Sequence, residues 1–338
     1  MHDVARVAEV SIKTVSNVVN DYPHVRPDTR QRVLDAITQL GYRPNLSARG
    51  LRSGRTGVIG LAVPALRENY FAELADAVIR AAERRGVGVM VEQTGGRREA
   101  ELLAASGGRR RLMDGILFSP TILGQADVDA LAVDFPMVLL GERIFGGPTD
   151  HVTMHNVSSA RAAVEHLLGI GRRRVALLGA GLDAGDEAGS ATLRLRGYRR
   201  ALEAAGIALS PELVRPTEHW DRATGAAATR RLIDDGVAFD AVFALNDTLG
   251  LGALRALGEA GIRVPDDVAL IGFDNIDEAR YSVPSMSSID TGRDRIAEMA
   301  VDLLLERIHE KGERRPPRTL TPDFRVVGRE STGFADGG

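Results

Sequence analysis

The sequence predicts an α/β protein that has a small helical head, a short hinge and two lobes of parallel β-sheet. Residues 3–40 show helical hydrophobic spacings and no alternating strand pattern. From residue 57 onward, short apolar runs alternate with amphipathic helical stretches, and this alternation favours parallel sheets covered by helices. The alternation extends through about ten strands, which is long for one open sheet and favours two stacked lobes.

Three short helices are expected in the head. Their apolar faces are Val4, Val7 and Ala8, then Val15, Val18 and Val19, then Val33, Ile37 and Leu40. A turn over residues 9–11 separates the first two helices, and Ser11 is a suitable N-cap for the second. Pro27 suits the first turn of the third helix, which ends at Gly41. Three short helices with a tight turn between the first two describe a helix-turn-helix.

The second helix of a helix-turn-helix enters the DNA major groove with its N-terminal residues at the bases. The predicted DNA-contacting residues here are Ile12, Lys13, Thr14, Ser16, Asn17 and Asn20. The valines of this helix face the head's own core, which places Ile12, Lys13, Ser16 and Asn17 on the outer side. Lysine reaches guanine, asparagine suits adenine and isoleucine contacts a thymine methyl group, while Thr14 and Ser16 can serve phosphates. The alternative interpretation of these residues is an ordinary solvent-exposed helix face that binds no DNA.

Charge separates the head from the rest of the chain. Residues 1–55 contain nine Lys or Arg and five Asp or Glu, a net charge of +4, whereas the whole chain has a net charge of −3. The remaining 283 residues therefore have a net charge of −7. A basic head on an acidic body indicates a polyanionic partner for the head alone.

Composition excludes several classes of protein. The 338 residues contain no cysteine, which excludes a disulfide framework, a thiolate zinc site and a cysteine nucleophile. No apolar run reaches the length of a membrane span, and the N-terminus has no apolar region of a signal peptide. We therefore expect a cytoplasmic protein with no membrane partner.

The strand candidates of the core are nearly continuous apolar runs, as expected of strands buried on both faces. They are residues 58–63, 87–92, 115–118, 137–140, 175–178, 241–245 and 268–273. The helix candidates between them are residues 72–85, 160–168, 195–205, 223–235 and 249–260. A helix over 293–311 and a strand near 320–327 follow the second set of strands, and we expect them to cross back between the lobes.

These elements divide the chain into four parts. We expect a DNA-binding head over residues 1–43 and a hinge helix with its linker over residues 44–56. The first lobe is expected over 57–156 with about 290–318, and the second over 157–289 with about 319–330.

Several separate stretches resemble the LacI/GalR family of bacterial transcription regulators. The head contains DVARVAEVSIKTVSNVVN, then TRQRV and LGYRPN, and LRSGRTGVIGL at 51–61 resembles the family's hinge and first strand. ALNDTLGLGALRAL at 244–257 and VPDDVALIGFDN at 264–275 resemble its second lobe, and GREST at 328–332 resembles its C-terminal end. The resemblance covers essentially the whole chain. It implies a core like that of periplasmic sugar-binding proteins and a regulator, not an enzyme, that binds a pseudo-palindromic operator as a homodimer.

The chain departs from the family pattern at three positions. Glu9 stands where the family usually has glycine, and a left-handed backbone costs more there without glycine. Asn17 stands where many members have arginine, so the base read there is expected to differ. His155 replaces an aspartate of the family's effector site, which leaves the effector class open.

The predicted hinge starts at Asn45, which can cap a short helix over residues 46–51. Such a helix is too short to be stable alone, and Gly50 weakens it by about 1 kcal/mol relative to alanine. We expect it to order only with DNA and a partner hinge. The resemblance implies that Leu51 is an apolar wedge in the minor groove, and Arg49 and Arg52 are candidates for pairing with the DNA backbone. The alternative is an ordinary linker.

A small molecule is expected between the lobes, at the carboxyl ends of the strands. The candidate effector-binding residues are Tyr70, Phe71, Arg194, Trp220, Asn246 and Asp274. Aromatic faces stack on sugars or bases, and an aspartate that accepts two hydroxyls beside an arginine suits a polyol. The alternatives are core packing for Trp220 and helix capping for Asn246 and Asp274.

The sequence also contains a pattern that resembles a nucleotide-binding site. Residues 179–184 match the dinucleotide pattern G-x-G-x-x-A, but the acidic residues 186–187 that follow do not suit phosphate. No metal-ligand spacing occurs, and we expect no cofactor. The rival hypotheses are a sugar-binding module or a sugar-metabolising enzyme with a helical appendage, and the same regulator with a purine or nucleoside effector. Among these hypotheses, a repressor with a sugar effector is favoured.

Residues 333–338 carry no leucine heptads, so we expect a dimer and not a tetramer held by a coiled coil.

Overall fold

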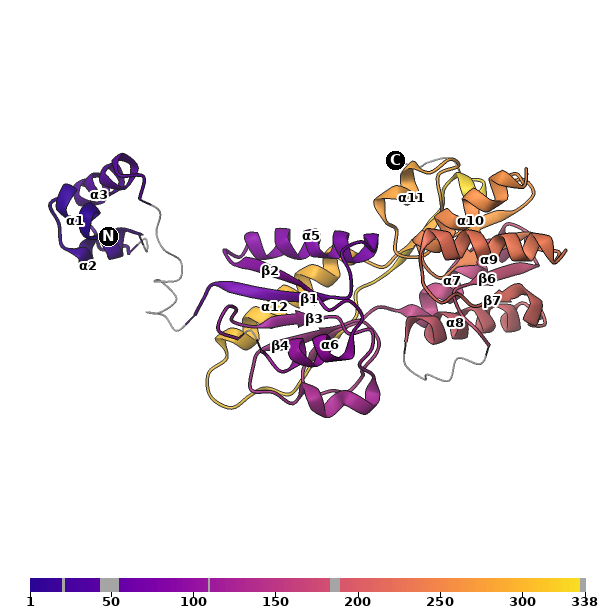
Figure 1. Cartoon of the computed structure of the whole chain (residues 1–338), viewed down its shortest axis with the longest axis horizontal. Coiled ribbons are helices and arrows are strands. Elements are labelled where there is room, and N and C mark those ends of the chain that lie inside the picture. Colours follow the sequence, from indigo (N-terminus) through magenta and orange to yellow (C-terminus); the bar gives the residue numbers. More distant parts are fainter. Residues whose placement is uncertain (20–21, 43–54, 109, 183–188, 335–338) are drawn as a thin grey trace. The chain divides into compact units, whose positions relative to one another are not determined.

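The computed structural model describes residues 1–19, 22–42, 55–108, 110–182 and 189–334. The chain forms two units, Met1–Gly57 and Val58–Gly338, which are the helical head and the core (Figure 1). No helix in the described ranges is both long enough and apolar enough to cross a membrane.

The head consists of three helices, as predicted. They are α1 (His2–Val7), α2 (Ile12–Val19) and α3 (Pro27–Gln39). Ser11 caps α2 by accepting a hydrogen bond from the Thr14 amide at 3.1 Å, and Pro27 lies in the first turn of α3. Both of these predictions are confirmed. Val4, Val15 and Val33, one from each helix, are fully buried and form the centre of the head's small core.

The connection between α1 and α2 contains a left-handed residue. Glu9 has φ +52°, a conformation that favours glycine. The family resemblance suggested a left-handed backbone at this position, and the structure confirms it. A side chain in this conformation destabilises the turn by about 1–2 kcal/mol.

The first lobe of the core is built on a six-stranded parallel sheet with the order β11-β5-β4-β3-β1-β2. Its strands are β1 (Val58–Val63), β2 (Gly88–Gln93), β3 (Ile116–Phe118), β4 (Met137–Leu140), β5 (Asp150–Val152) and β11 (Thr319–Leu320). Its helices are α5 (Asn69–Glu83), α6 (Arg98–Ala105), the 3₁₀ helix η1 (Gln125–Leu131) and α12 (Arg293–His309). One face of the sheet packs against α5 and α12, and the other against α6 and η1.

The second lobe is built on a four-stranded parallel sheet with the order β7-β6-β8-β9. Its strands are β6 (Val175–Leu178), β7 (Val214–Arg215), β8 (Ala241–Ala244) and β9 (Ala269–Ile271), and β10 (Ser288–Asp290) pairs antiparallel with β12 (Arg325–Val327) beside them. Its α-helices are α7 (Asn156–Gly169), α8 (Ser190–Ala204), α9 (Arg222–Asp234), α10 (Asp247–Glu259) and α11 (Asp277–Tyr281), and its 3₁₀ helices are η2 (Pro211–Leu213) and η3 (Glu330–Thr332). Helices α7 and α8 cover one face, and α9 and α10 cover the other.

The predicted fold class is confirmed, but two details were wrong. Helix α12 does not cross between the lobes: Ile296, Val301 and Leu304 pack into the core of the first lobe. The chain instead passes between the lobes at residues 153–155, 291–292 and 321–324 (Figure 1). Strand β2 is not buried on both faces, because it lies at the edge of its sheet and its residues are half-buried or exposed.

Candidate functional site

The outer face of α2 carries most of the side chains that the sequence placed there. Ile12 is 40% exposed, Lys13 is exposed, and Thr14 and Asn17 are half-buried. The placement of Ser16 was wrong, because Ser16 is only 6% exposed. Helix α2 packs against both α1 and α3, so its buried face is wider than the valine stripe and includes the small side chain of Ser16.

Four predicted DNA-contacting residues lie outside the described residues. They are Asn20, which follows α2, and the hinge residues Arg49, Leu51 and Arg52.

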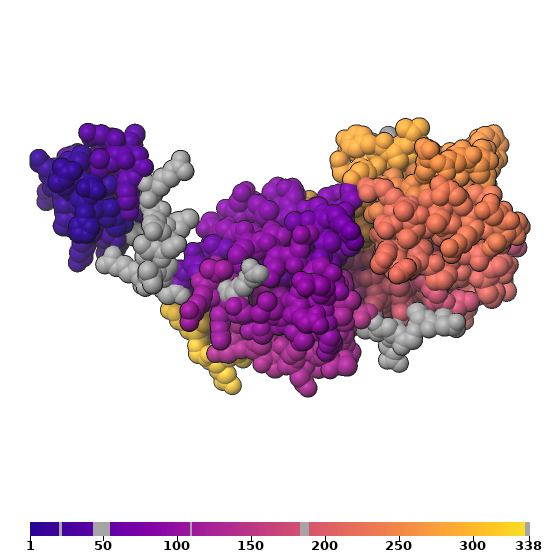
Figure 2. All heavy atoms as spheres, viewed as in Figure 1, coloured from indigo at the N-terminus to yellow at the C-terminus, as the bar shows by residue number. Residues whose placement is uncertain are grey.

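A pocket of about 500 Å³ lies between the two lobes of the core. All six predicted effector-binding residues line it: Tyr70, Phe71, Arg194, Trp220, Asn246 and Asp274. The volume falls in the range of small-molecule sites. Figure 2 shows the first lobe (purple) and the second lobe (orange) meeting along this boundary, where the Asp277 amide donates to Glu73 at 2.9 Å.

Two aromatic rings form the wall contributed by the first lobe. Tyr70 and Phe71 lie in the first turn of α5, with ring centroids 5.3 Å apart in an edge-on arrangement. Burial raises the pKa of the Tyr70 hydroxyl, and the nearby carboxyls of Asp274 and Glu142 raise it further. The hydroxyl therefore stays neutral and remains able to donate a hydrogen bond to a ligand.

Arg194, on α8, is fixed at the floor of the pocket. Its side chain is 4% exposed, its Nε donates to Asn156 Oδ1 at 2.8 Å and its Nη1 donates to the Leu245 carbonyl. The guanidinium carbon lies 3.6 Å from the centre of the Phe273 ring and 5.4 Å from that of Trp220. Because its position is held by these contacts, Arg194 loses little freedom when a ligand binds.

Asp274 follows β9 and faces Arg194 without a direct hydrogen bond, because its Oδ1 lies 3.7 Å from Arg194 Nη2. Its backbone has φ +106°, and the side chain is 8% exposed. Burial raises the pKa of Asp274 from 3.8 to about 7, although the charges of Arg194 and Arg293 act in the opposite direction. A ligand hydroxyl that donates to Asp274 and accepts from Arg194 would satisfy both groups.

The raised pKa of Asp274 predicts a pH-dependent stability. The unfolded chain ionises this carboxyl near pH 3.8 and the folded chain near pH 7, so the folded state binds the extra proton between these values. The contribution of Asp274 to the free energy of unfolding should therefore fall as the pH rises from about 4 to about 7, by on the order of 2–4 kcal/mol, and then stay constant. Asp274→Asn should remove this dependence, since asparagine tolerates a positive φ. Urea unfolding of the wild type and of Asp274→Asn at pH 5 and pH 8 measures the effect. If the free energies of unfolding of the two proteins differ by the same amount at both pH values, the prediction is wrong.

Asn246 lines the pocket, but its polar atoms are engaged. Its Oδ1 caps α10 by accepting from the Leu249 amide at 2.8 Å, and its Nδ2 donates to the Trp220 carbonyl at 3.2 Å. The alternative of a helix cap, considered from the sequence, therefore describes its role in this structure. Trp220 Nε1 donates to the Gly179 carbonyl at 2.9 Å, which orients the indole ring, and Asn246 holds the backbone of Trp220.

Sequence reasoning missed a polar pair that spans the pocket. Glu142, after β4 in the first lobe, is 6% exposed and accepts a hydrogen bond from Ser190 Oγ at the start of α8. Glu142 follows the carboxyl end of a parallel strand, which is the same signal that identified Asn246 and Asp274. His155, by contrast, is exposed and does not line the pocket, whereas its neighbours Met154 and Asn156 contact Arg194.

The loop that carries Asp274 is tied to the first lobe. Arg293, at the start of α12, donates to the Asp274 carbonyl at 3.1 Å and forms an ion pair with Glu73 of α5. Glu73 also accepts the Asp277 amide. These contacts connect the loop of Asp274 to α5 and α12. Within the described ranges, no group of three or more His, Cys, Asp or Glu residues is arranged to hold a metal ion.

Residues 1–45 match the family of bacterial regulatory proteins named lacI, and residues 164–332 match the periplasmic binding protein-like domain. The chain is 30% identical over 329 residues to the HTH-type transcriptional repressor PurR of Histophilus somni, which covers 95% of this chain and 96% of that protein.

Two solved structures extend the comparison. A LacI-family transcriptional regulator from Sanguibacter keddieii is 53% identical, covers 83% of this chain and 100% of its own, and has a TM-score of 0.77. The complex of the transcriptional regulator CelR with cellobiose is 31% identical, covers 97% of this chain and 98% of its own, and has a TM-score of 0.69.

Proposed function

This chain belongs to the LacI family of bacterial transcription regulators, and from that membership we propose that it represses sugar-utilisation genes and that a sugar binds between its lobes. Regulators of this family are not enzymes; they bind operator DNA and small effectors as dimers. The observation that carries the proposed effector class is the placement of the Asp274 carboxyl and the Arg194 guanidinium 3.7 Å apart beside Trp220 in one pocket.

The polar groups of the pocket favour a polyol over a purine. Asp274 and Glu142 both line it, so the site presents two carboxyl groups whose oxygens accept hydrogen bonds. A sugar offers several hydroxyl donors to such groups, whereas a purine base offers few. The rings of Trp220 and Phe71 supply the apolar faces on which a pyranose can stack. The cellobiose bound by the relative CelR supports this class.

A purine or nucleoside effector is the second candidate, favoured by the similarity to PurR. Thermal unfolding against a panel of mono- and disaccharides, purine bases and nucleosides separates the two, because a ligand of the folded state raises Tm in proportion to its affinity. We expect at least one sugar to raise Tm and the purines to leave it unchanged. A rise with purines alone would overturn the sugar proposal.

We propose the following division of the chain, with limits taken from the sequence. Residues 1–43 read the operator, 44–56 form the hinge, and the lobes comprise 57–156 with about 290–318 and 157–289 with about 319–330. In the head, the proposed base contacts come from Ile12, Lys13 and Asn17, which occupy the accessible face of α2.

Lys13→Ala should weaken operator binding by roughly 1–3 kcal/mol if Lys13 contacts a base. Lys13 is exposed in the first turn of α2, where a recognition helix meets base edges. Fluorescence anisotropy on an operator duplex and on a random duplex of equal length measures the loss. A loss of the same size on both duplexes would show that Lys13 serves phosphates only.

A further inference from the structure

One edge of the first lobe lies where the linker from the head joins the core. Strand β1 begins at Val58, directly after the linker, and all strands of this sheet are parallel. The amino ends of β2, β3, β4, β5 and β11 therefore lie at the same edge as Val58. The effector pocket lies at the opposite, carboxyl end of the strands. We call the loops that precede these strands the linker edge: residues 84–87, 106–115, 132–136, 146–150 and 309–318.

The linker edge is basic, whereas the core as a whole is acidic. Its five loops contain nine Lys or Arg and five Asp or Glu. One of the five acidic residues, Asp150, is fully buried and paired with Arg307 of α12. Arg84, Arg85, Arg315 and Arg318 of these loops pair with Glu298, Asp302 and Glu306 of α12, so most of the edge's arginines are already neutralised.

Arg110 and Arg111 lie beside the point where the linker enters. Both are exposed, in the loop before β3. The Asp114 amide in the same loop donates to the Val58 carbonyl at 2.8 Å, which fixes this loop against the first residue of β1. Neither arginine forms an ion pair with any residue in the described part of the chain.

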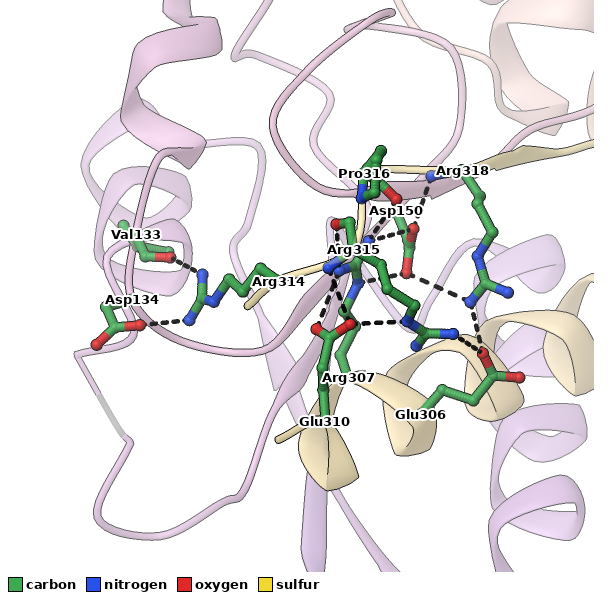
Figure 3. Close-up of polar contacts among 10 residues, drawn as sticks. All are labelled: Val133, Asp134, Asp150, Glu306, Arg307, Glu310, Arg314, Arg315, Pro316 and Arg318. Carbon is green, nitrogen blue, oxygen red and sulfur yellow. Dashed lines mark hydrogen bonds and ion pairs between the residues drawn. The ribbon is translucent and has the colours of Figure 1, made fainter. Parts of the chain in front are cut away.

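The loop over residues 310–318 is the second basic part of this edge, and it is held in place by ion pairs (Figure 3). Asp150 accepts from Arg307 Nε at 2.7 Å and from the Arg318 amide at 2.7 Å. Glu310 accepts from Arg315 Nε at 2.7 Å. In the same picture, Arg314 reaches across to Asp134. These contacts fix the backbone of the loop, and Lys311 projects from it exposed and outside the ion pairs that the described residues form.

We propose that the linker edge is a second DNA-contacting surface, in which Arg110, Arg111 and Lys311 meet the phosphates of the duplex that flanks the operator. The proposal rests on DNA binding by the head. The 15 residues from 43 to 57 span at most about 50 Å even when extended, so the core stays near the DNA to which the head is bound. Duplex DNA carries about one negative charge per 1.7 Å, and each Lys or Arg that neutralises a phosphate releases condensed counterions.

The test compares salt dependence on two duplexes. The operator is first selected from random DNA with the full-length protein and is then placed in a duplex of about 20 bp or in the centre of one of about 60 bp. Arg110→Gln/Arg111→Gln/Lys311→Gln is compared with the wild type and with a control that removes three exposed arginines of the second lobe, Arg196→Gln/Arg200→Gln/Arg231→Gln.

On the long duplex, the slope of log affinity against log salt should shrink by roughly 2–3 in the linker-edge variant, because each lost phosphate contact removes about 0.9. On the short duplex, the slope of the linker-edge variant should equal that of the wild type. The slope of the control variant should equal that of the wild type on both duplexes. An unchanged slope on the long duplex, or an equal loss on both duplexes, would overturn the proposal. Failure of the wild type to select any operator would instead contradict the function proposed for the head.

Discussion

Arg307→Met should destabilise the core by about 3–5 kcal/mol, the largest effect expected of any single substitution discussed here. Arg307 is 11% exposed, and its partner Asp150 is fully buried. The guanidinium donates to both Asp150 oxygens, at 2.7 and 2.9 Å, and to the carbonyls of Arg315 and Pro316 (Figure 3). Methionine fills much of the space but leaves the Asp150 charge buried without its main partner.

Urea unfolding followed by circular dichroism measures this loss as a fall in the midpoint at constant m. The double variant Asp150→Leu/Arg307→Met should recover part of it, because a buried pair replaced by apolar groups is often tolerated. The matched control is Arg255→Met, which removes an exposed partner of Glu259 and should change stability by less than about 1 kcal/mol. A loss below about 1 kcal/mol for Arg307→Met would contradict the role assigned to the pair.

Asp274→Asn should greatly reduce the response at effector concentrations that just saturate the wild type, and leave the operator affinity of the free protein within about 1 kcal/mol of the wild type. The substitution keeps the shape of the side chain at φ +106° and removes the carboxylate that we expect to accept ligand hydroxyls. Hydrogen bonds to a charged group contribute about 1.5–3 kcal/mol each, so effector affinity should fall roughly tenfold to a hundredfold or more.

Asp234→Asn, at an exposed carboxyl at the end of α9, is the control and should respond as the wild type does. Effector affinity is measured by calorimetry with the sugar that gives the largest rise in Tm. If Asp274→Asn binds that sugar as the wild type does, Asp274 is not part of the site, and Arg194, Glu142 and Trp220 remain to account for it.

The composition of the effector pocket was predictable because parallel sheets collect loop residues at one edge. Asp274 and Asn246 each follow a buried strand, and the structure brings both to the same pocket. What they do there was only partly predictable. The cap that Asn246 forms on the Leu249 amide is local and was one of the alternatives, but its bond to the Trp220 carbonyl comes from a loop 26 residues away, which local sequence spacing does not report.

Three errors have separate physical causes. The sequence placed about 290–318 with the first lobe, where Ile296, Val301 and Leu304 pack, but an apolar stripe does not show whether a helix also reaches the other lobe. The valine spacing of α2 did not reveal that two neighbouring helices also bury Ser16. The apolar run of strand β2 did not show that the strand lies at the edge of its sheet, where it is not buried on both faces.

We propose that this chain binds operator DNA through its head and that a sugar between the lobes changes that binding. The most direct measurement is operator affinity of the full-length protein at fixed salt, with and without the sugar that most raises Tm. A coupling free energy of about 1–3 kcal/mol is typical of allosteric proteins, so we predict a change of at least about fivefold, greatly reduced in Asp274→Asn at a sugar concentration that just saturates the wild type. Equal operator affinity with and without a saturating sugar that demonstrably binds the core would contradict the account.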